Sequence, residues 1–242
     1  MIIHSKIDKG IIRNSNQDAY FAGQLAENIT FAIVCDGMGG ANAGNIASEI
    51  AVKTVSEYLY NSYRENMSID EIEKVIKNAI TSANIQIYDR ACNNDALNGM
   101  GTTAVVAVIK GYEAVIANVG DSRIYLINDS INQLTKDHSI VQSLIESGKI
   151  TPDDAKVHPR KNVITRALGV ETEVIPDTDF INVSPRDTLL LCTDGLTNFV
   201  SEQKILETFN NNDISVVSDK LVDLANHNGG GDNITVVTLT VE

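Results

Sequence analysis

The stretch TAVVAVIKGYEAVIANVGDSRIYLI, residues 103–127, decides the fold class of this chain. It contains apolar and β-branched runs at Thr103 to Ile109, Glu113 to Val119 and Arg123 to Ile127, which are typical of strands. Only Lys110-Gly111-Tyr112 and Gly120-Asp121-Ser122 join these runs, and links this short cannot contain the helix that a parallel crossover needs. The stretch therefore predicts an antiparallel meander.

Three further runs predict strands, at Thr30 to Cys35, Thr188 to Thr193 and Ile234 to Val241. Many of these runs are apolar at nearly every position, where a strand with one wet face would alternate. We expect these strands to be covered on both faces, by another sheet on one side and by helices on the other.

Apolar residues at helical spacing predict helices around Ile46 to Leu59, Ile72 to Ile87, Ile205 to Phe209 and Ile214 to Ala225. Ser68 and Glu71 form a capping box at the start of the second.

Between Asp137 and Thr165 the chain turns polar, with a short helix over Ile140 to Glu146, a stop at Gly148 and a new start at Thr151-Pro152-Asp153. This segment is predicted to leave the core. The chain shows no repeat and no linker, so residues 1–242 are expected to form one domain.

The composition argues against several classes of protein. Acidic residues number 32 against 19 basic ones, and the net charge of −13 disfavours nucleic acid and anionic membranes as partners. No apolar run approaches the ~20 residues of a spanning helix, and the N-terminus lacks the pattern of a signal peptide. The three cysteines are too scattered for a disulfide framework, and Cys35 and Cys192 are expected to be buried. We expect a cytoplasmic protein.

Four aspartates stand beside glycine where strands are expected to end: Asp36, Asp121, Asp194 and Asp232. An aspartate next to glycine is ordinary in a turn, and that reading holds for each residue taken alone. If the strands lie side by side, however, the four carboxylates meet and repel one another in a partly buried place. A cation must then lie between them.

The chemistry of this acidic group favours Mg²⁺ or Mn²⁺, because these hard ions prefer oxygen ligands. Zinc is disfavoured, because His4, His138, His158 and His227 lack the spacing of a zinc site.

Near the N-terminus, Arg13 lies five residues before another carboxylate, Asp18. An arginine suits bidentate binding of phosphate oxygens, although a surface arginine in a polar turn is the alternative. The chain has neither a P-loop nor a Gly-x-Gly-x-x-Gly motif, so its glycines do not indicate a nucleotide site.

The motifs occur in a specific order: Arg13-x-x-Asn16-Gln17-Asp18, Asp36-Gly37-Met38-Gly39-Gly40, Gly101-Thr102-Thr103, Gly120-Asp121-Ser122-Arg123, Thr165-Arg166-Ala167-Leu168-Gly169, Asp194-Gly195-Leu196 and Gly231-Asp232-Asn233. In this order the chain resembles the metal-dependent PPM, or type 2C, protein serine/threonine phosphatases over essentially its whole length. Its compact length is most similar to the bacterial stand-alone members.

The resemblance implies an α+β fold, a four-layer α/β/β/α sandwich of two mainly antiparallel sheets flanked by helices. It also implies a binuclear centre in which Asp36 bridges two Mn²⁺ or Mg²⁺ ions, with Asp194, Asp232 and the Gly37 carbonyl as further ligands. By the same resemblance Asp18 holds metal-bound waters, and Asp121 with Asp194 binds a third, weaker ion. The polar segment from Asp137 to Thr165 matches the mobile flap of bacterial relatives.

The mechanism expected from the resemblance is attack on phosphorus by a hydroxide that bridges the two ions, with Asp36, Asp194 and Asp232 as catalytic residues and no covalent intermediate. Arg13 is expected to clamp the phosphate. Met38 stands where many eukaryotic members carry a proposed proton-donating His, and a thioether cannot donate a proton. Water or His158 of the flap is left as the acid, although His158 also fits a structural role before Pro159. Gln17 replaces a Glu found in many members, which removes a negative charge near the second ion.

The expected function is dephosphorylation of phosphoserine and phosphothreonine proteins, opposing a bacterial serine/threonine kinase, by a monomer in signalling. One alternative is a catalytically silent metal-binding scaffold of the same fold that binds a phosphoprotein. Another is a haloacid-dehalogenase-type phosphatase with an aspartyl nucleophile. That type has an Asp-x-Asp motif after a strand, whereas here Gly37 and Met38 follow Asp36.

Overall fold

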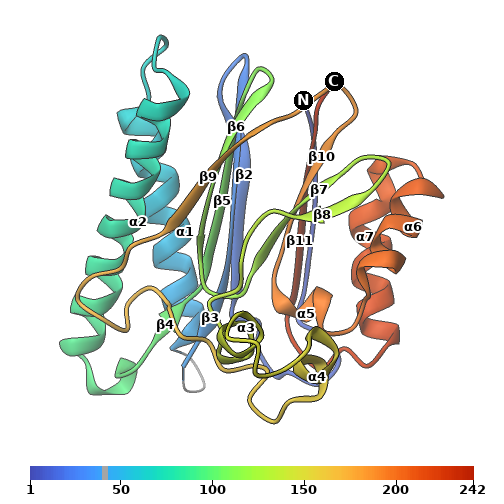
Figure 1. Cartoon of the computed structure of the whole chain (residues 1–242). Helices are drawn as coiled ribbons and strands as arrows, with labels where there is room; N and C mark the ends of the chain where they lie inside the picture. The colour runs from blue at the N-terminus through green and yellow to red at the C-terminus, as the bar shows by residue number, and fades with distance from the viewer. Residues whose placement is uncertain (40–42) are drawn as a thin grey trace.

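Two stacked antiparallel sheets form the centre of the computed structural model, which describes residues 1–39 and 43–242 (Figure 1). The first sheet has the order β1 (Ile2–Asp8), β11 (Ile234–Thr240), β10 (Thr188–Cys192), β7 (Arg123–Ile127) and β8 (Ile131–Gln133). The second has the order β2 (Asp18–Ala26), β3 (Ile29–Met38), β5 (Ala104–Lys110), β6 (Glu113–Val119) and β9 (Asp177–Asn182), and the short β4 (Gly101–Thr102) pairs with the end of β3. Gly40 of the predicted glycine motif lies outside the described residues.

Helices cover the outer face of each sheet (Figure 1). Helices α1 (Gly44–Ser62) and α2 (Ile69–Cys92), with the 3-10 turn η1 (Asp95–Leu97), belong to the second sheet. Helices α5 (Asp194–Thr197), α6 (Glu202–Asn210) and α7 (Ile214–His227) belong to the first. The four-layer α/β/β/α prediction is confirmed. None of the helices in the described ranges is long and apolar enough to cross a membrane.

The side chains of β3 explain why its apolar residues do not alternate with polar ones. Phe31, Ile33 and Cys35 pack into the cluster under α1 and α2. Ala32 and Val34 point the other way, into the cluster between the two sheets. A third cluster lies between the first sheet and α5 to α7. Both faces of the strand are therefore buried, as the sequence predicts.

The predicted meander is wrong in its last strand. β5 pairs with β6 as expected, but β7 pairs with β10 and β8 in the other sheet. The link Gly120–Ser122 is too short for a helix, yet it is long enough to carry the chain from one stacked sheet to the other. Gly120 has φ +108, and a Cβ there would lie 2.5 Å from the Cγ2 of Thr103, so the corner requires glycine.

The predicted helices are confirmed, and their ends follow ordinary capping chemistry. Ser68 Oγ accepts from the Glu71 amide at 3.2 Å, and Glu71 Oε2 accepts from the Ser68 amide at 2.8 Å, which completes the predicted capping box of α2. In the polar segment, α3 (Ile140–Glu146) and α4 (Pro152–Val157) occur where the sequence places them, with Gly148 at φ +66 between them. Both short helices lie at the end of the sandwich opposite the chain termini (Figure 1).

Candidate active site

Asp18 and Asp36 face each other on neighbouring strands, because the β2–β3 register pairs these two residues. The sequence places Asp36 after the end of its strand, but β3 continues through Asp36 to Met38 and pairs with β4. Thr102 and Thr103 fix the backbone here. The Asp36 amide donates to Thr103 Oγ1 at 2.9 Å, and the Asp36 carbonyl accepts from Thr102 Oγ1 at 2.9 Å. The acidic side chain thus stands on a rigid strand.

Asp194 and Asp232 come from the first sheet. Asp194 opens α5 directly after β10, and Asp232 precedes β11. Gly195 allows the two segments to meet, because a Cβ at this position would lie 1.8 Å from the Asn233 carbonyl oxygen. Asp194 Oδ2 accepts from Asn198 Nδ2 at 2.9 Å. The carboxyls of Asp194 and Asp36 lie close enough for each to influence the pKa of the other.

Asp121 lies in the link that crosses between the sheets, and its charge acts on the same group. Asp194 and Asp137 are the charges that most raise the pKa of Asp121, and Asp121 in turn raises the pKa of Asp36. The structure therefore brings together all five aspartates that the sequence predicts at the site: Asp18, Asp36, Asp121, Asp194 and Asp232.

Burial and mutual repulsion both disfavour the charged form of these aspartates. Burial raises the pKa of Asp18 to about 7, with a further rise from the charges of Asp194 and Asp232, although two hydrogen bonds oppose the shift. Burial, then the charge of Asp194, raises the pKa of Asp121 to about 7. Burial followed by the charge of Asp18 raises the pKa of Asp36 well above its usual range.

Within the described residues, two carboxylate oxygens in this cluster are buried without a hydrogen-bond partner, Asp18 Oδ1 and Asp194 Oδ1. Orphaned acceptors inside a group of like charges are what a bound cation would satisfy. Across the described ranges, no three acidic, histidine or cysteine side chains converge tightly enough to enclose an ion by themselves. Magnesium and manganese tolerate this, because such ions keep several waters and need few carboxylates. The residues fit hard divalent cations.

Gly37 sits tightly between β2 and the start of α1. Its amide donates to the Gln17 carbonyl at 3.1 Å, and a Cβ at Gly37 would lie 2.1 Å from the Gly44 carbonyl oxygen. The predicted ligand Gly37 is therefore adjacent to Asp36 in a place where no other residue fits without displacing the helix.

Arg13 lies at the edge of the acidic cluster. Its Nη2 donates to Asp232 Oδ2 at 2.8 Å, its Nε donates to the Gly231 carbonyl at 3.3 Å, and its side chain is half-exposed. The guanidinium is thus held beside the carboxylates by one side chain and keeps contact with solvent, which suits a group that receives a phosphate.

Asn233 and two threonines are site residues to which sequence reasoning gave no role. Asn233 Oδ1 accepts from the Gln17 amide at 2.8 Å, and its Nδ2 donates to the carbonyls of Lys9 and Ser15, so it fixes the N-terminal loop against β11. Thr193 and Thr235 both donate to Asp18 Oδ2, at 3.0 and 2.7 Å. The Gly231-Asp232-Asn233 motif indicates that Asn233 belongs to the site. Nothing in the sequence links the two threonines to Asp18.

The base of the polar segment 137–165 is anchored to the loop that carries Asp121. His138 Nδ1 accepts from the Gly120 amide at 3.0 Å, and Asp137 receives two hydrogen bonds from Arg123, at 2.9 and 2.7 Å. His158 ends α4, and its Nδ1 accepts from the amide of Arg160 at 3.1 Å. This local contact favours the structural reading of His158 over the reading as a proton donor.

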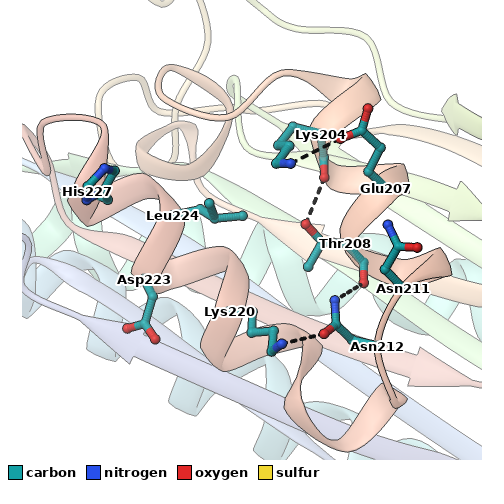
Figure 2. A pocket seen from close by; sticks show the side chains of 9 residues that line it. All are labelled: Lys204, Glu207, Thr208, Asn211, Asn212, Lys220, Asp223, Leu224 and His227. Atoms are coloured by element: carbon teal, nitrogen blue, oxygen red, sulfur yellow. Dashed lines mark hydrogen bonds and ion pairs between the residues drawn. The ribbon is translucent and has the colours of Figure 1, made fainter.

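One cavity lies away from the carboxylates. It measures about 540 Å³ between α6 and α7 and is lined by Lys204, Glu207, Thr208, Asn211, Asn212, Lys220, Asp223, Leu224 and His227 (Figure 2). Its lysines are engaged with neighbours, Lys204 with Glu207 and Lys220 with Asn212. The acidic cluster, with its orphaned oxygens, is therefore the better candidate for chemistry.

Comparison with known proteins identifies the family. A family model described as protein phosphatase 2C matches residues 5–223. The chain belongs to the protein phosphatase 2C family. The serine/threonine phosphatase stp of Listeria welshimeri is 43% identical to it over 234 residues, which cover 96% of this chain and 92% of the relative.

Solved structures of bacterial type 2C phosphatases share the fold. Serine/threonine phosphatase Stp1 from Staphylococcus aureus has a TM-score of 0.94 at 36% identity, with 99% of this chain and 94% of that chain covered. The catalytic domain of the phosphatase PstP, solved in complex with 2 manganese ions, has a TM-score of 0.85 at 31% identity, with 100% and 98% covered. The predicted family, fold and class of enzyme are confirmed, and dependence on divalent metal ions is supported.

Proposed function

We propose that this type 2C phosphatase hydrolyses phosphoserine and phosphothreonine in proteins, with two Mn²⁺ or Mg²⁺ ions held by Asp36, Asp194, Asp232 and the Gly37 carbonyl. The observation that carries the proposal is the pair of buried, unpartnered oxygens, Asp18 Oδ1 and Asp194 Oδ1, among five like charges. In the proposal Asp18 binds waters of the ions, and Asp121 with Asp194 holds a third, weaker ion.

When bound, the ions acidify water at neutral pH and neutralise charge on the phosphate. The chain's own residues supply position. Arg13 holds its guanidinium toward solvent beside Asp232 and receives the phosphate oxygens, which fixes phosphorus next to the acidic cluster. Thr193 and Thr235 hold Asp18 in place through its Oδ2 and leave its Oδ1 available.

Hydrolysis of p-nitrophenyl phosphate by the purified protein, with and without Mn²⁺, tests the proposal. We expect Asp36→Asn and Asp194→Asn to lower kcat by about a thousandfold, because loss of a charged ligand weakens both ion binding and charge neutralisation. Arg13→Ala is expected to raise KM about tenfold with a smaller change in kcat, because Arg13 positions the phosphate. Activity without metal, or equal small effects of the three substitutions, would contradict it.

Three features of the biological setting remain proposals drawn from the sequence: a cognate serine/threonine kinase, a monomeric state and a cytoplasmic location. Phosphoproteins as substrates are supported by the relatives, which are named serine/threonine phosphatases. We also propose that segment 137–165, with α3 and α4, acts as a flap beside the site, because its base contacts the loop of Asp121 through His138. Sedimentation tests the monomeric state, and cell fractionation tests the cytoplasmic location.

A further inference from the structure

A groove of about 460 Å³ lies next to the acidic cluster and takes no part in the chemistry described so far. Its lining includes Met38 of β3, Val170, Glu171, Glu173 and Ile175. The lining residues other than Met38 lie between Ile164, at the end of the polar segment, and Ile175, before β9. Met38 follows Asp36 by two residues on β3, so the groove begins beside the strand that carries Asp36.

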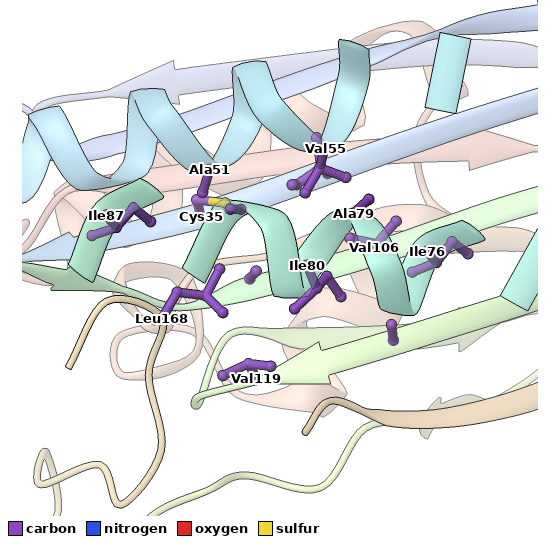
Figure 3. Packing of buried hydrophobic residues seen from close by; sticks show 14 of the residues in the cluster. Cys35, Ala51, Val55, Ile76, Ala79, Ile80, Ile87, Val106, Val119 and Leu168 are labelled. Carbon is purple, nitrogen blue, oxygen red and sulfur yellow. The ribbon is translucent and has the colours of Figure 1, made fainter. Parts of the chain in front are cut away.

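Backbone contacts fix this groove relative to Asp36. The Thr102 amide donates to the Leu168 carbonyl at 3.1 Å, and the Leu168 amide donates back to the Thr102 carbonyl at 2.9 Å. Thr102 is also the residue whose hydroxyl donates to the Asp36 carbonyl. Leu168 itself is fully buried in the cluster under α1 and α2, near Ile87 (Figure 3). These hydrogen bonds connect the wall of the groove to the strand that carries Asp36.

The lack of a side chain at Gly101 leaves room at the floor of the groove. A Cβ at Gly101 would lie 2.9 Å from Val170 Cγ2 and 3.0 Å from Met38 Cε. Met38, the residue that replaces a proposed proton donor in other members, therefore lies near Val170 at Gly101 and adds apolar surface to the groove. An apolar surface next to a phosphate site serves recognition better than proton transfer.

The chemistry of the groove combines exposed apolar side chains with acidic ones. Val170 is 51% exposed and Ile175 is 77% exposed, although both are large apolar residues. The cation of the lining, Arg166, is held by Asp177 at 2.6 Å and also donates to the Ile175 carbonyl. Glu171 and Glu173 therefore give the groove an acidic character.

We propose that this groove binds the substrate residues that flank the phosphorylated serine or threonine, and that it selects a large apolar side chain accompanied by a lysine or arginine. The inference rests on the proposed function. The apolar side chain covers Val170 and Ile175, and the basic side chain pairs with Glu171 or Glu173. A substrate segment fits better than a second copy of this chain, because two molecules of net charge −13 repel each other while a basic segment is attracted.

Matched phosphothreonine peptides test the inference with the manganese-loaded enzyme. One peptide carries Leu and Arg next to the phosphothreonine, and its partner carries Gly and Gln there. We expect the unmodified enzyme to prefer the first by about tenfold in kcat/KM, through KM. Ile175→Ser should reduce this preference to about twofold or less, and Glu173→Lys should remove the preference for Arg over Gln.

Two controls separate recognition from general damage. Val216→Ser changes an apolar residue on α7 that is 40% exposed and outside the groove, and it should leave the peptide preference unchanged. Hydrolysis of p-nitrophenyl phosphate should be the same in all variants, because this small substrate does not reach the groove.

The possible failures are distinguishable. If the unmodified enzyme hydrolyses neither p-nitrophenyl phosphate nor peptide, the proposed function fails. If it hydrolyses both peptides equally well, or if Ile175→Ser leaves the preference intact, only the groove assignment is overturned. A concentration-dependent dimer in sedimentation that Ile175→Ser abolishes would overturn it in favour of a second copy as the occupant.

Discussion

At the scale of single residues, Asp18 shows how the fold sustains a buried carboxylate. Its Oδ2 accepts two hydroxyl hydrogen bonds, from Thr193 and Thr235, while its Oδ1 has no partner. Burial raises the pKa of Asp18 to about 7, and these two hydrogen bonds act against that rise. The threonines therefore help to keep the charged form available for an ion.

Replacing Thr235 with valine should weaken ion binding without disturbing phosphate binding. The substitution keeps the shape and removes one donor to a carboxylate, an interaction worth about 1.5–3 kcal/mol. We expect the Mn²⁺ concentration for half-maximal activity to rise about tenfold, with KM for p-nitrophenyl phosphate unchanged at saturating metal.

Thr238→Val is the matched control. Thr238 lies on the same strand, is fully buried, and donates to the His4 carbonyl at 3.3 Å instead of to a site residue. Its substitution should affect thermal stability and leave the metal requirement unaltered. An equal metal requirement in both variants would refute the role assigned to Thr235.

The residue scale also shows what the sequence predicts well. Asp36, Asp194 and Asp232 stand beside glycines next to apolar runs, and the sequence predicts that they meet if those strands lie side by side. The partners of Asp18 are not predicted, because Thr193 and Thr235 are 175 and 217 residues away from it in sequence and look like ordinary strand residues. Only the stacking of the sheets brings these hydroxyls to the carboxylate.

At the scale of elements, some of the strands that the sequence misses have mixed burial. β1 is largely half-buried, and four of the six residues of β9 are exposed, so neither produces an apolar run. The crossing at Gly120–Ser122 escapes prediction for a different reason. A three-residue link limits the distance between strand ends, but it does not state whether the next strand pairs in the same sheet or begins the facing one.

The close approach of α5 to β11 leads to a prediction about Gly195. Alanine here would place its Cβ 1.8 Å from the Asn233 carbonyl oxygen, so the segments that carry Asp194 and Asp232 must move apart. We expect Gly195→Ala to lower Tm by about 5 °C or more and to weaken Mn²⁺ binding, measured by calorimetry and by titration of activity.

Gly111→Asn provides the comparison, because Gly111 has φ +61 and open space around its Cβ position. Asparagine tolerates this conformation, so stability should change little and metal binding not at all. Similar metal affinity in the Gly195 variant and the unmodified enzyme would show that the contact does not position the two aspartates.

At the scale of the whole molecule, the carboxylate cluster joins the two sheets, with Asp18 and Asp36 on one and Asp194 and Asp232 next to the other. In a chain of net charge −13 this junction is under electrostatic repulsion unless protons or cations neutralise it. Stability, pH and metal binding are therefore linked in this protein.

The sign of the pH dependence follows from the raised pKa values. Asp18 and Asp121 have a pKa of about 7 in the folded protein, against 3.8 as the ordinary value. Between about pH 4 and pH 7 the folded metal-free protein thus binds protons that the unfolded chain has released, and its free energy of unfolding falls as pH rises through this window. Burial lowers the pKa of His138 below its ordinary value of 6.5, so near that pH His138 makes the free energy of unfolding rise with pH. This is one group against the two aspartates.

We therefore expect the chelator-treated protein to have a Tm at pH 8 about 5 °C or more below its Tm at pH 5.5. Millimolar Mn²⁺ should raise Tm strongly at pH 8 and weakly at pH 5.5, because protons compete with the ion for the same oxygens. Asp18→Asn, which removes one of the titrating groups, should flatten the dependence in the chelator. Calorimetry at the two pH values decides the matter: a metal-free Tm that stays level or rises toward pH 8 would mean that these carboxylates do not repel one another across the two sheets.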